Sequence, residues 1–328
     1  MKSDAEKTIK TLKEINEFPF YTATYYGNYK LGEFKQGAID SPLAAVPFFE
    51  DLFKKMGAPI ALSFTTPPAL QSGCSAFYCR TGEESNLLGK NLDWKKDPIL
   101  LLRTRPNDGY NSLTMVNLNF CDLFNIGSLK YKLLLSPYVP LDGINENGLV
   151  VTMLSVHEGA EYPFMPNKIS VGDFNIIRII LDSCKDVDEA LEYFGGYNLR
   201  QTGMLPLHYL IADRQKSCIV EFAYGEINIK ESSELNYLTN FIKLKNPDYE
   251  NKKKSCQRYQ KIEKELLKNK KILDIPTAQK LLKDVSVFQP HFEIPTTIWS
   301  IIYDINQLKM IIRIGKEAKQ YTVTLVSS

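Results

Sequence analysis

Short apolar stretches dominate the chain from residue 74 onward, and their length and composition predict β-strands. Turn-forming Gly, Asn, Asp and Pro residues separate these stretches. The predicted strand regions are 74–81, 86–94, 98–106, 111–120, 142–156, 207–222, 227–241, 296–314 and 321–328. Within the fifth region we expect Gly148 to adopt a positive φ, because it closes the turn NENG.

Apolar residues at helical spacing predict helices between groups of strands. The predicted helical regions are 4–17, 41–62, 172–194, 251–271 and 276–285. Residues 183–194 either continue the third helix or form a second short one. This order of strands, helices, strands, helices and strands favours an α+β sandwich over βαβ winding. The sequence contains neither G-x-G-x-x-G nor a Walker loop, so nucleotide binding is disfavoured.

Residues 1–73 differ in character from the rest of the chain. An aromatic, strand-like stretch at 18–34 lies between the first two predicted helices, and TTPPALQSG at 65–73 is typical of an extended segment. We therefore expect a small N-terminal appendage that ends in an exposed linker just before Cys74.

Composition places the chain among ordinary globular proteins and disfavours two classes of binding partner. The 328 residues are 44% hydrophobic and 24% charged, with a net charge of +2, so neither nucleic acid nor an anionic membrane is indicated. No run of about 18 apolar residues occurs, and the N-terminus does not resemble a secretion signal. Six scattered cysteines without a CxxC pair, and three histidines, indicate reduced thiols and no zinc site. We expect a cytoplasmic protein without a cofactor.

Cys74 is the residue whose position suggests chemistry. A cysteine acts as a nucleophile only when a base takes its proton. His208 or His291 would supply that base in a papain-like arrangement. The alternative base is the α-amine of Cys74 itself, which titrates near about 8. That alternative requires cleavage between Gly73 and Cys74.

The remaining parts of such a site have candidates along the chain. If 74–81 and 86–94 form a hairpin, Asp93 returns beside Cys74 and is placed to hold the amine. Lys90 or Arg258 would supply a cation near the thiol. Asn240, in LTN at the end of a predicted strand, suits an oxyanion donor.

Six motifs in this order resemble the choloylglycine hydrolase family. These are linear amide C–N hydrolases of the N-terminal-nucleophile (Ntn) superfamily, which include bile salt hydrolases and penicillin V acylases. The motifs are CSAF at 74–77, GKNLDW at 89–94, NENGL at 145–149, LHYLIAD at 207–213, LTN at 238–240 and QRY at 257–259. They span nearly the whole chain after residue 73.

The resemblance implies a four-layer αββα sandwich with two facing antiparallel sheets. It implies that Cys74 is the nucleophile, that Asp93 binds its freed α-amine, that Asn240 contributes to the oxyanion hole and that Arg258 lines the reaction centre. Two positions depart from the family pattern. Lys90 replaces an Arg, which keeps the charge but loses the bidentate fork, and Ser155 stands where bile salt hydrolases carry an Asn.

The long leader resembles that of the acyl-CoA:6-aminopenicillanate acyltransferase branch, whose precursors cleave themselves at Gly-Cys. We therefore expect residues 1–73 to be a propeptide cleaved at Gly73–Cys74, and residues 74–328 to be the catalytic domain. The expected activity is hydrolysis of a small-molecule N-acyl amide (bile-salt-, penicillin V- or N-acyl-amino-acid-like) through a Cys74 thioester. The alternatives are an N-acyltransferase and an inactive binding protein on the same fold. The resemblance leaves a homo-oligomer open.

Overall fold

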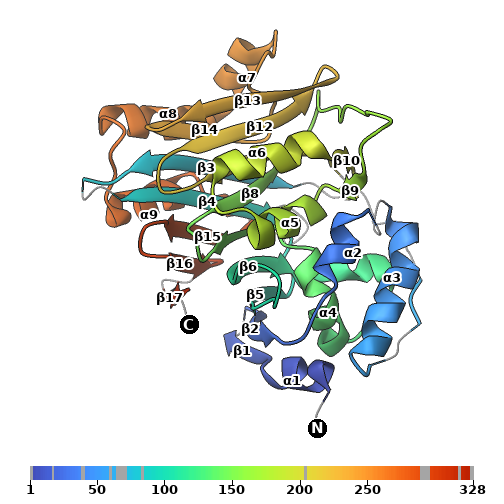
Figure 1. The fold of residues 1–328 in the computed structure, drawn as a ribbon. Helices are drawn as coiled ribbons and strands as arrows, with labels where there is room; N and C mark the ends of the chain where they lie inside the picture. Colours follow the sequence, from blue (N-terminus) through green and yellow to red (C-terminus); the bar gives the residue numbers. More distant parts are fainter. Residues whose placement is uncertain are drawn as a thin grey trace.

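Two β-sheets stacked face to face form the centre of the molecule (Figure 1). The computed structural model describes residues 3–16, 18–37, 41–58, 61–63, 72–82, 85–202, 205–288, 296–316 and 319–325. One sheet has nine strands, which are, in spatial order, β1 (Lys13–Asn16), β2 (Phe20–Tyr25), β5 (Ile99–Thr104), β6 (Ser112–Asn117), β7 (Asp142–Asn145), β8 (Val150–Ser155), β11 (Leu207–Ala212), β12 (Ser217–Ala223) and β13 (Glu226–Ser232). The other has six, which are β14 (Leu235–Leu238), β3 (Gly73–Arg80), β4 (Asn86–Trp94), β15 (Thr296–Asp304), β16 (Lys309–Ile314) and β17 (Gln320–Thr324).

Helices cover the outer face of each sheet, which confirms the four-layer αββα prediction. Helices α8 (Gln257–Lys268) and α9 (Ile275–Asp284) pack on the six-stranded sheet, and the short α7 (Tyr249–Ser255) precedes them. Helix α5 (Asn175–Ser183) packs on β7 and β8, with α6 (Val187–Gly196) beside it. A small parallel pair, β9 (Ser170–Gly172) and β10 (Asn198–Arg200), completes the described strands.

The two faces of β4 point into different environments, which explains why its polar residues are all buried. Leu88, Leu92 and Trp94 belong to the main apolar core, which includes residues of both sheets, whereas Leu87 belongs to the core under α8 and α9. Because side chains alternate along a strand, Lys90 points into the space between the sheets, and Asn91 and Asp93 point toward the helices.

The described residues of the segment 1–73 are built into the fold rather than appended to it. Strand β2 pairs with β5 in parallel, from Phe20 opposite Ile99 to Tyr25 opposite Thr104, and it is the one parallel pairing described within the two main sheets. Helices α1 (Asp4–Lys10), α2 (Leu31–Lys35) and α3 (Pro42–Lys55) lie beside α4 (Leu129–Leu135) (Figure 1). The ring of Phe49 in α3 packs on Tyr138, with centroids 4.9 Å apart. The expected separate appendage is therefore wrong.

Several boundaries differ from the sequence prediction. The helix predicted at 4–17 ends at Lys10, because the hydroxyl of Thr11 bonds the backbone N–H and carbonyl of Thr24 and the chain turns into β1. Helix α3 is shorter than its predicted region, and the region 172–194 splits into α5 and α6, where Asp186 caps α6 by accepting from the backbone N–H of Glu189. The predicted strand at 111–120 ends in a 3-10 helix, Leu118–Phe124, and part of 18–34 is helix α2. Gly148 has a φ of 88°, as expected.

The linker expected at 65–73 is settled only at its end. Residues 65–71 lie outside the described residues, while Ser72 and Gly73 are buried, so that this end is not exposed. All six cysteines are free thiols. Within the described ranges, no three His, Cys, Asp or Glu side chains gather as metal ligands, and no helix has the length and apolarity to cross a membrane.

Candidate active site

Cys74 is the second residue of β3, at a point where the strand has neighbours on both sides. Leu92 of β4 lies opposite Cys74, and β14 pairs with the other edge of β3 up to Leu238, opposite Ala76. Continuing the antiparallel register, Asn240 arrives beside Cys74, although the two are 166 residues apart in the chain. Cys74 is only 1% exposed.

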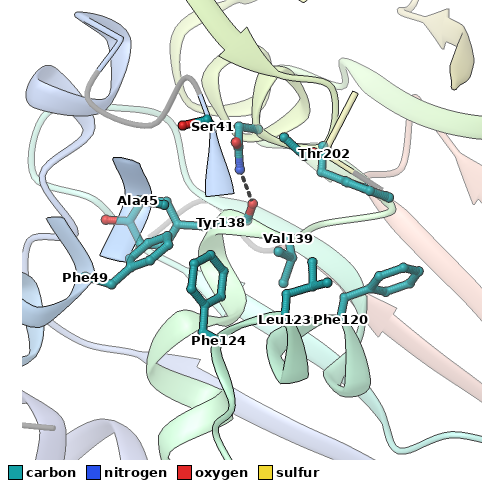
Figure 2. Close-up of a pocket in the computed structure, with 11 residues that line it drawn as sticks. Ser41, Ala45, Phe49, Phe120, Leu123, Phe124, Tyr138, Val139 and Thr202 are labelled. Atoms are coloured by element: carbon teal, nitrogen blue, oxygen red, sulfur yellow. Dashed lines mark hydrogen bonds between the residues drawn. The ribbon is translucent and has the colours of Figure 1, made fainter. Parts of the chain in front are cut away.

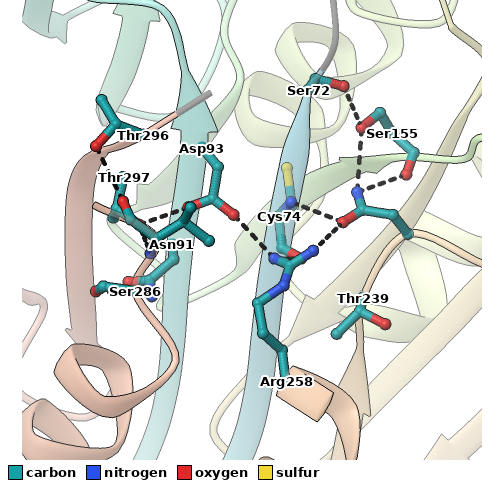
Figure 3. Close-up of polar contacts among 12 residues, drawn as sticks. Ser72, Cys74, Asn91, Asp93, Ser155, Thr239, Arg258, Ser286, Thr296 and Thr297 are labelled. Carbon is teal, nitrogen blue, oxygen red and sulfur yellow. Dashed lines mark hydrogen bonds and ion pairs between the residues drawn. The ribbon is translucent and has the colours of Figure 1, made fainter. Parts of the chain in front are cut away.

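Arg258 connects the candidate residues through one guanidinium group (Figure 3). Its Nη1 donates to the backbone carbonyl of Cys74 at 2.7 Å and to Oδ2 of Asp93 at 2.9 Å. Its Nη2 donates to Oδ1 of Asn240 at 2.8 Å. Arg258 is at the start of α8, so the helix layer supplies the cation that holds residues of β3, β4 and the segment after β14 together.

Asp93 is a buried carboxylate with both oxygens engaged. Thr297 donates to Oδ1 at 2.6 Å, and Arg258 donates to Oδ2. Burial raises the pKa of Asp93, while the charge of Arg258 and the Thr297 hydrogen bond act in the opposite direction. Gly73 lies opposite Asp93 in the β3–β4 register, and a Cβ at Gly73 would lie 2.8 Å from Oδ2 of Asp93. The carboxylate therefore leaves room for no side chain at residue 73.

The amide of Asn240 has an orientation that its partners dictate. Its Oδ1 accepts from the backbone N–H of Cys74 at 2.9 Å and from Arg258, which are both donors. Its Nδ2 donates to the backbone carbonyl of Ser155 at 2.8 Å and to the Ser155 hydroxyl at 3.1 Å. Ser155, the last residue of β8, therefore holds the amide of Asn240 from the nine-stranded sheet.

The residue before Gly73 is held as firmly as the residue after it. The hydroxyls of Ser72 and Ser155 are 2.6 Å apart (Figure 3). Nε2 of His157 lies 2.8 Å from the carbonyl oxygen of Ser72. Sequence reasoning missed Ser72, His157 and Thr297. Only the position of Ser72 next to the Gly-Cys junction could have drawn attention to it.

The segment that carries Asn240 is anchored by a buried pair on the nine-stranded sheet. His208 of β11 places Nε2 2.8 Å from the carbonyl oxygen of Thr239, and its Nδ1 lies 3.0 Å from Glu221 of β12. Glu221 also accepts from the backbone N–H groups of Lys243 and Leu244. Both side chains are fully buried. Both ring nitrogens of His208 therefore have partners other than Cys74, so His208 does not support the papain-like alternative. The other candidate base, His291, lies outside the described residues.

Lys90 is fully buried and donates from Nζ to the backbone carbonyl of Met153. It lies opposite Ala76, two residue pairs along the sheet from the Cys74–Leu92 pair, so the side chains of Lys90 and Cys74 are on the same face. Its charge also acts on Asp142, whose carboxylate accepts from Tyr303 at 2.5 Å. Burial raises the pKa of Asp142 to about 6, and the charge of Lys90 opposes that rise.

An apolar pocket lies beside the thiol. Its polar lining residues are Ser72, Cys74 and Ser155, and the others are Leu92, Trp94, Phe120, Met153, Phe174, Leu205 and Leu207. A second pocket shares Phe120 and Phe174 with it, and residues of the leader line this second pocket, among them Ala45 and Phe49 (Figure 2). The two shared rings contact each other, with centroids 5.2 Å apart. They therefore form a wall between the two pockets.

The tertiary structure thus brings Cys74, Asp93, Asn240 and Arg258 into one hydrogen-bonded group, with Ser155 attached through Asn240. Lys90 joins this group only by sharing the sheet face of Cys74. The group combines a thiol, an ion pair and a side-chain amide, and an apolar pocket lies beside it. Such a set is suited to acyl transfer through a thioester.

Comparison with known proteins shows the family and the fold of the chain. The model of the family described as linear amide C–N hydrolases, choloylglycine hydrolase family, matches residues 74–280. Two solved structures of variants of the conjugated bile acid hydrolase from Clostridium perfringens are similar in fold, with TM-scores of 0.58 and 0.59, 13% identity, and coverage of 77% of this chain and 92% of theirs. Penicillin V acylase from Agrobacterium tumefaciens is similar with a TM-score of 0.55 and 15% identity, over 77% of this chain and 86% of that one.

Proposed function

Because the chain belongs to the choloylglycine hydrolase family of linear amide C–N hydrolases, we propose that it is a self-cleaving enzyme whose nucleophile is the thiol of Cys74. The observation that carries the proposal is the convergence of Asn240 and Arg258 on the backbone of Cys74, with Asp93 beside Gly73. The match to the family begins at Cys74, which supports cleavage immediately before this residue.

Maturation is an N→S acyl shift followed by hydrolysis. The Cys74 sulfur attacks the carbonyl carbon of Gly73, so that a C–S bond forms and the Gly73–Cys74 C–N bond breaks. The thiol proton ends on the nitrogen of Cys74, which becomes the α-amine. Water then attacks the thioester, releases the Gly73 carboxylate and restores the thiol. Residues 1–73 are the propeptide in this scheme, and residues 74–328 are the catalytic domain.

Turnover repeats this chemistry on an external N-acyl amide. The freed α-amine takes the thiol proton and passes it to the leaving amine, and its ordinary pKa near about 8 suits both steps. Asp93, fixed by Thr297 and Arg258, holds the amine in place. Lys90 adds a buried positive charge on the thiol's side of the sheet.

The oxyanion of each tetrahedral intermediate needs donors beside Cys74. In the intact chain, Nδ2 of Asn240 contacts Ser155, and the hydroxyl of Ser155 contacts Ser72. Once the Gly73–Cys74 bond is cut, the chain no longer fixes Ser72 beside Cys74, and the Ser155 hydroxyl is released from that partner. We assign the oxyanion to Nδ2 of Asn240, with the Ser155 hydroxyl as a second donor.

The acyl group is placed in the apolar pocket beside Cys74. Seven of its ten lining residues are apolar, and Cys74 itself lines it, so an apolar acyl chain attached to the sulfur has a surface to cover. The substrate class is therefore a small-molecule N-acyl amide with an apolar acyl group. We place the enzyme in the cytoplasm, where free thiols persist.

Intact mass and N-terminal sequencing test the maturation step. We expect the purified chain to split into residues 1–73 and 74–328, and Cys74→Ala to remain whole and inactive on a panel of N-acyl amides. Cys79→Ala is the matched control, because Cys79 is a buried cysteine of the same strand that belongs to the core under α8 and α9. A whole chain that hydrolyses amides, or Cys74→Ala that splits normally, would refute the free-amine mechanism.

A further inference from the structure

The buried His208–Glu221 pair has no part in the chemistry proposed above, yet it lies next to the residues that do. In the β8–β11 register, Leu207 is opposite Ser155 and His208 is opposite Leu154. Ser155 bonds the side chain of Asn240, and His208 bonds the carbonyl oxygen of Thr239, the preceding residue. The end of β8 and the start of β11 therefore hold the amide of Asn240 and the backbone just before it.

The direction of the His208 hydrogen bond follows from its partner. A backbone carbonyl oxygen accepts only, so Nε2 of His208 carries the proton and donates it to Thr239. Glu221 orients the ring through Nδ1 at 3.0 Å, whichever of the two groups holds that proton. The same carboxylate accepts from the N–H groups of Lys243, at 3.0 Å to each oxygen, and of Leu244, at 2.6 Å.

This arrangement ties both ends of the segment 239–244 to the nine-stranded sheet. His208 holds the segment at Thr239, and Glu221 holds it at Lys243 and Leu244. Asn240 lies between these anchors, although it follows β14 of the other sheet. The amide of Asn240 must keep its position relative to Cys74 to within fractions of an ångström if it is to bind an oxyanion.

We propose that His208, oriented by Glu221, is a positioning residue for the oxyanion donor Asn240. The assignment rests on the function proposed above. His208 touches neither Cys74 nor the substrate. It acts by fixing the backbone of Thr239, from which the Asn240 side chain reaches both the N–H of Cys74 in the intact chain and the oxyanion during turnover.

The His208–Glu221 pair is hydrogen-bonded and fully buried, so no water can replace a partner that is removed. Replacing His208 leaves the Thr239 carbonyl and the Glu221 carboxylate without their buried partner. The backbone of Thr239 is then free to shift, and Asn240 shifts with it. Since an oxyanion donor acts in the transition state, the loss lowers kcat and leaves KM nearly unchanged.

The test is steady-state kinetics on the full-length chain, with rates divided by the amount of N-terminal cysteine that a selective aldehyde reagent titrates in the denatured sample. We expect His208→Leu to lower kcat per titrated site 10- to 100-fold with KM within twofold, and to slow self-cleavage as well. His208→Gln keeps an N–H donor for Thr239 and should recover most of the rate. Glu221→Gln, which weakens the orientation of the ring, should lower kcat about 3- to 10-fold.

Asp213 supplies the matched control, because it belongs to the same LHYLIAD motif at the far end of β11. Its carboxylate accepts from the backbone N–H groups of Val187, Gln215 and Lys216, so that its role is to hold a turn and the start of α6. We expect Asp213→Asn to lose thermal stability while keeping the wild-type kcat per titrated site. If His208 had a merely structural role, His208→Leu would likewise lose thermal stability and keep the wild-type kcat per titrated site.

Two outcomes separate failure of this inference from failure of the proposed function. Asn240→Ala with wild-type activity would overturn the oxyanion assignment itself. An inactive Asn240→Ala together with a wild-type kcat in His208→Leu, or in Glu221→Gln if His208→Leu does not fold, would overturn only the positioning role.

Discussion

Gly73→Ala tests the geometry of the proposed cleavage site more directly than any change to the proposed nucleophile, Cys74. The added Cβ would lie 2.8 Å from Oδ2 and 3.2 Å from Cβ of Asp93, and 3.5 Å from Nη2 of Arg258. Asp93 has no free direction to move, because Thr297 and Arg258 hold its two oxygens at 2.6 and 2.9 Å. The methyl group therefore has to break one of these charge-assisted hydrogen bonds, each worth about 1.5–3 kcal/mol.

The displacement would not stop at Asp93, because Arg258 also bonds the carbonyl of Cys74 and the amide of Asn240. We therefore expect Gly73→Ala to fold, to unfold about 1–3 kcal/mol more easily than the uncleaved Cys74→Ala chain, and to cleave itself about 10- to 100-fold more slowly than wild type.

The assay is a time course of intact mass after purification. Denaturant unfolding of the uncleaved chains is measured alongside. Gly82→Ala is the control, because a Cβ at Gly82 meets nothing within 4 Å. If Gly73→Ala matured as fast as Gly82→Ala, the contact with Asp93 would not constrain the cleaved bond, and the reasoning would be refuted.

Three further predictions follow from other parts of the structure. Phe120→Ala removes one ring of the wall between the two pockets and should move the preferred acyl chain of N-acyl amides to longer chains; unchanged chain-length preference contradicts this role. After cleavage, the two fragments should co-elute on size exclusion and separate only in denaturant, because β2 and Phe49 belong to the shared sheet and core; separate elution in buffer contradicts it. Burial raises the pKa of Asp142 from 3.8 to about 6. Between these pH values the folded protein keeps a proton on Asp142 that the unfolded chain has lost, so the stability of wild type falls as the pH rises. The unfolding free energy of Asp142→Asn relative to that of wild type should therefore rise by up to about 3 kcal/mol between pH 4 and pH 7. If the difference between the two proteins stayed constant over this range, the raised pKa of Asp142 would be refuted.

Much of the architecture was accessible from local patterns. The order of predicted strands and helices indicated the α+β class. The four layers were implied by the family resemblance that the ordered motifs carry. The predicted boundaries of helices and strands were wrong where side chains capped or redirected the backbone. Thr11, for instance, ends the first helix by bonding Thr24, a residue that helical periodicity does not reveal.

By itself the sequence determined which residue types were available for catalysis. Cys74, Asp93, Asn240 and Arg258 stand at strand ends or a helix start, and the proposed acyl transfer uses side chains of these types. Lys90 shows the limit of this reasoning, since its charge was predictable but its hydrogen bond to the Met153 carbonyl was not. Burial decides such partners, and burial is a property of the assembled layers.

Only the tertiary structure decided how the candidate residues meet. Pairing of β14 with β3 brings Asn240 to Cys74, and pairing of β2 with β5 makes the leader part of the sheet. The chain offers many apolar strands of similar composition, so local pattern cannot choose among their partners. Register, the covering of both sheet faces and the satisfaction of every buried polar group make that choice together. For the same reason the support that His208 gives to Thr239 is visible only after the two sheets have packed.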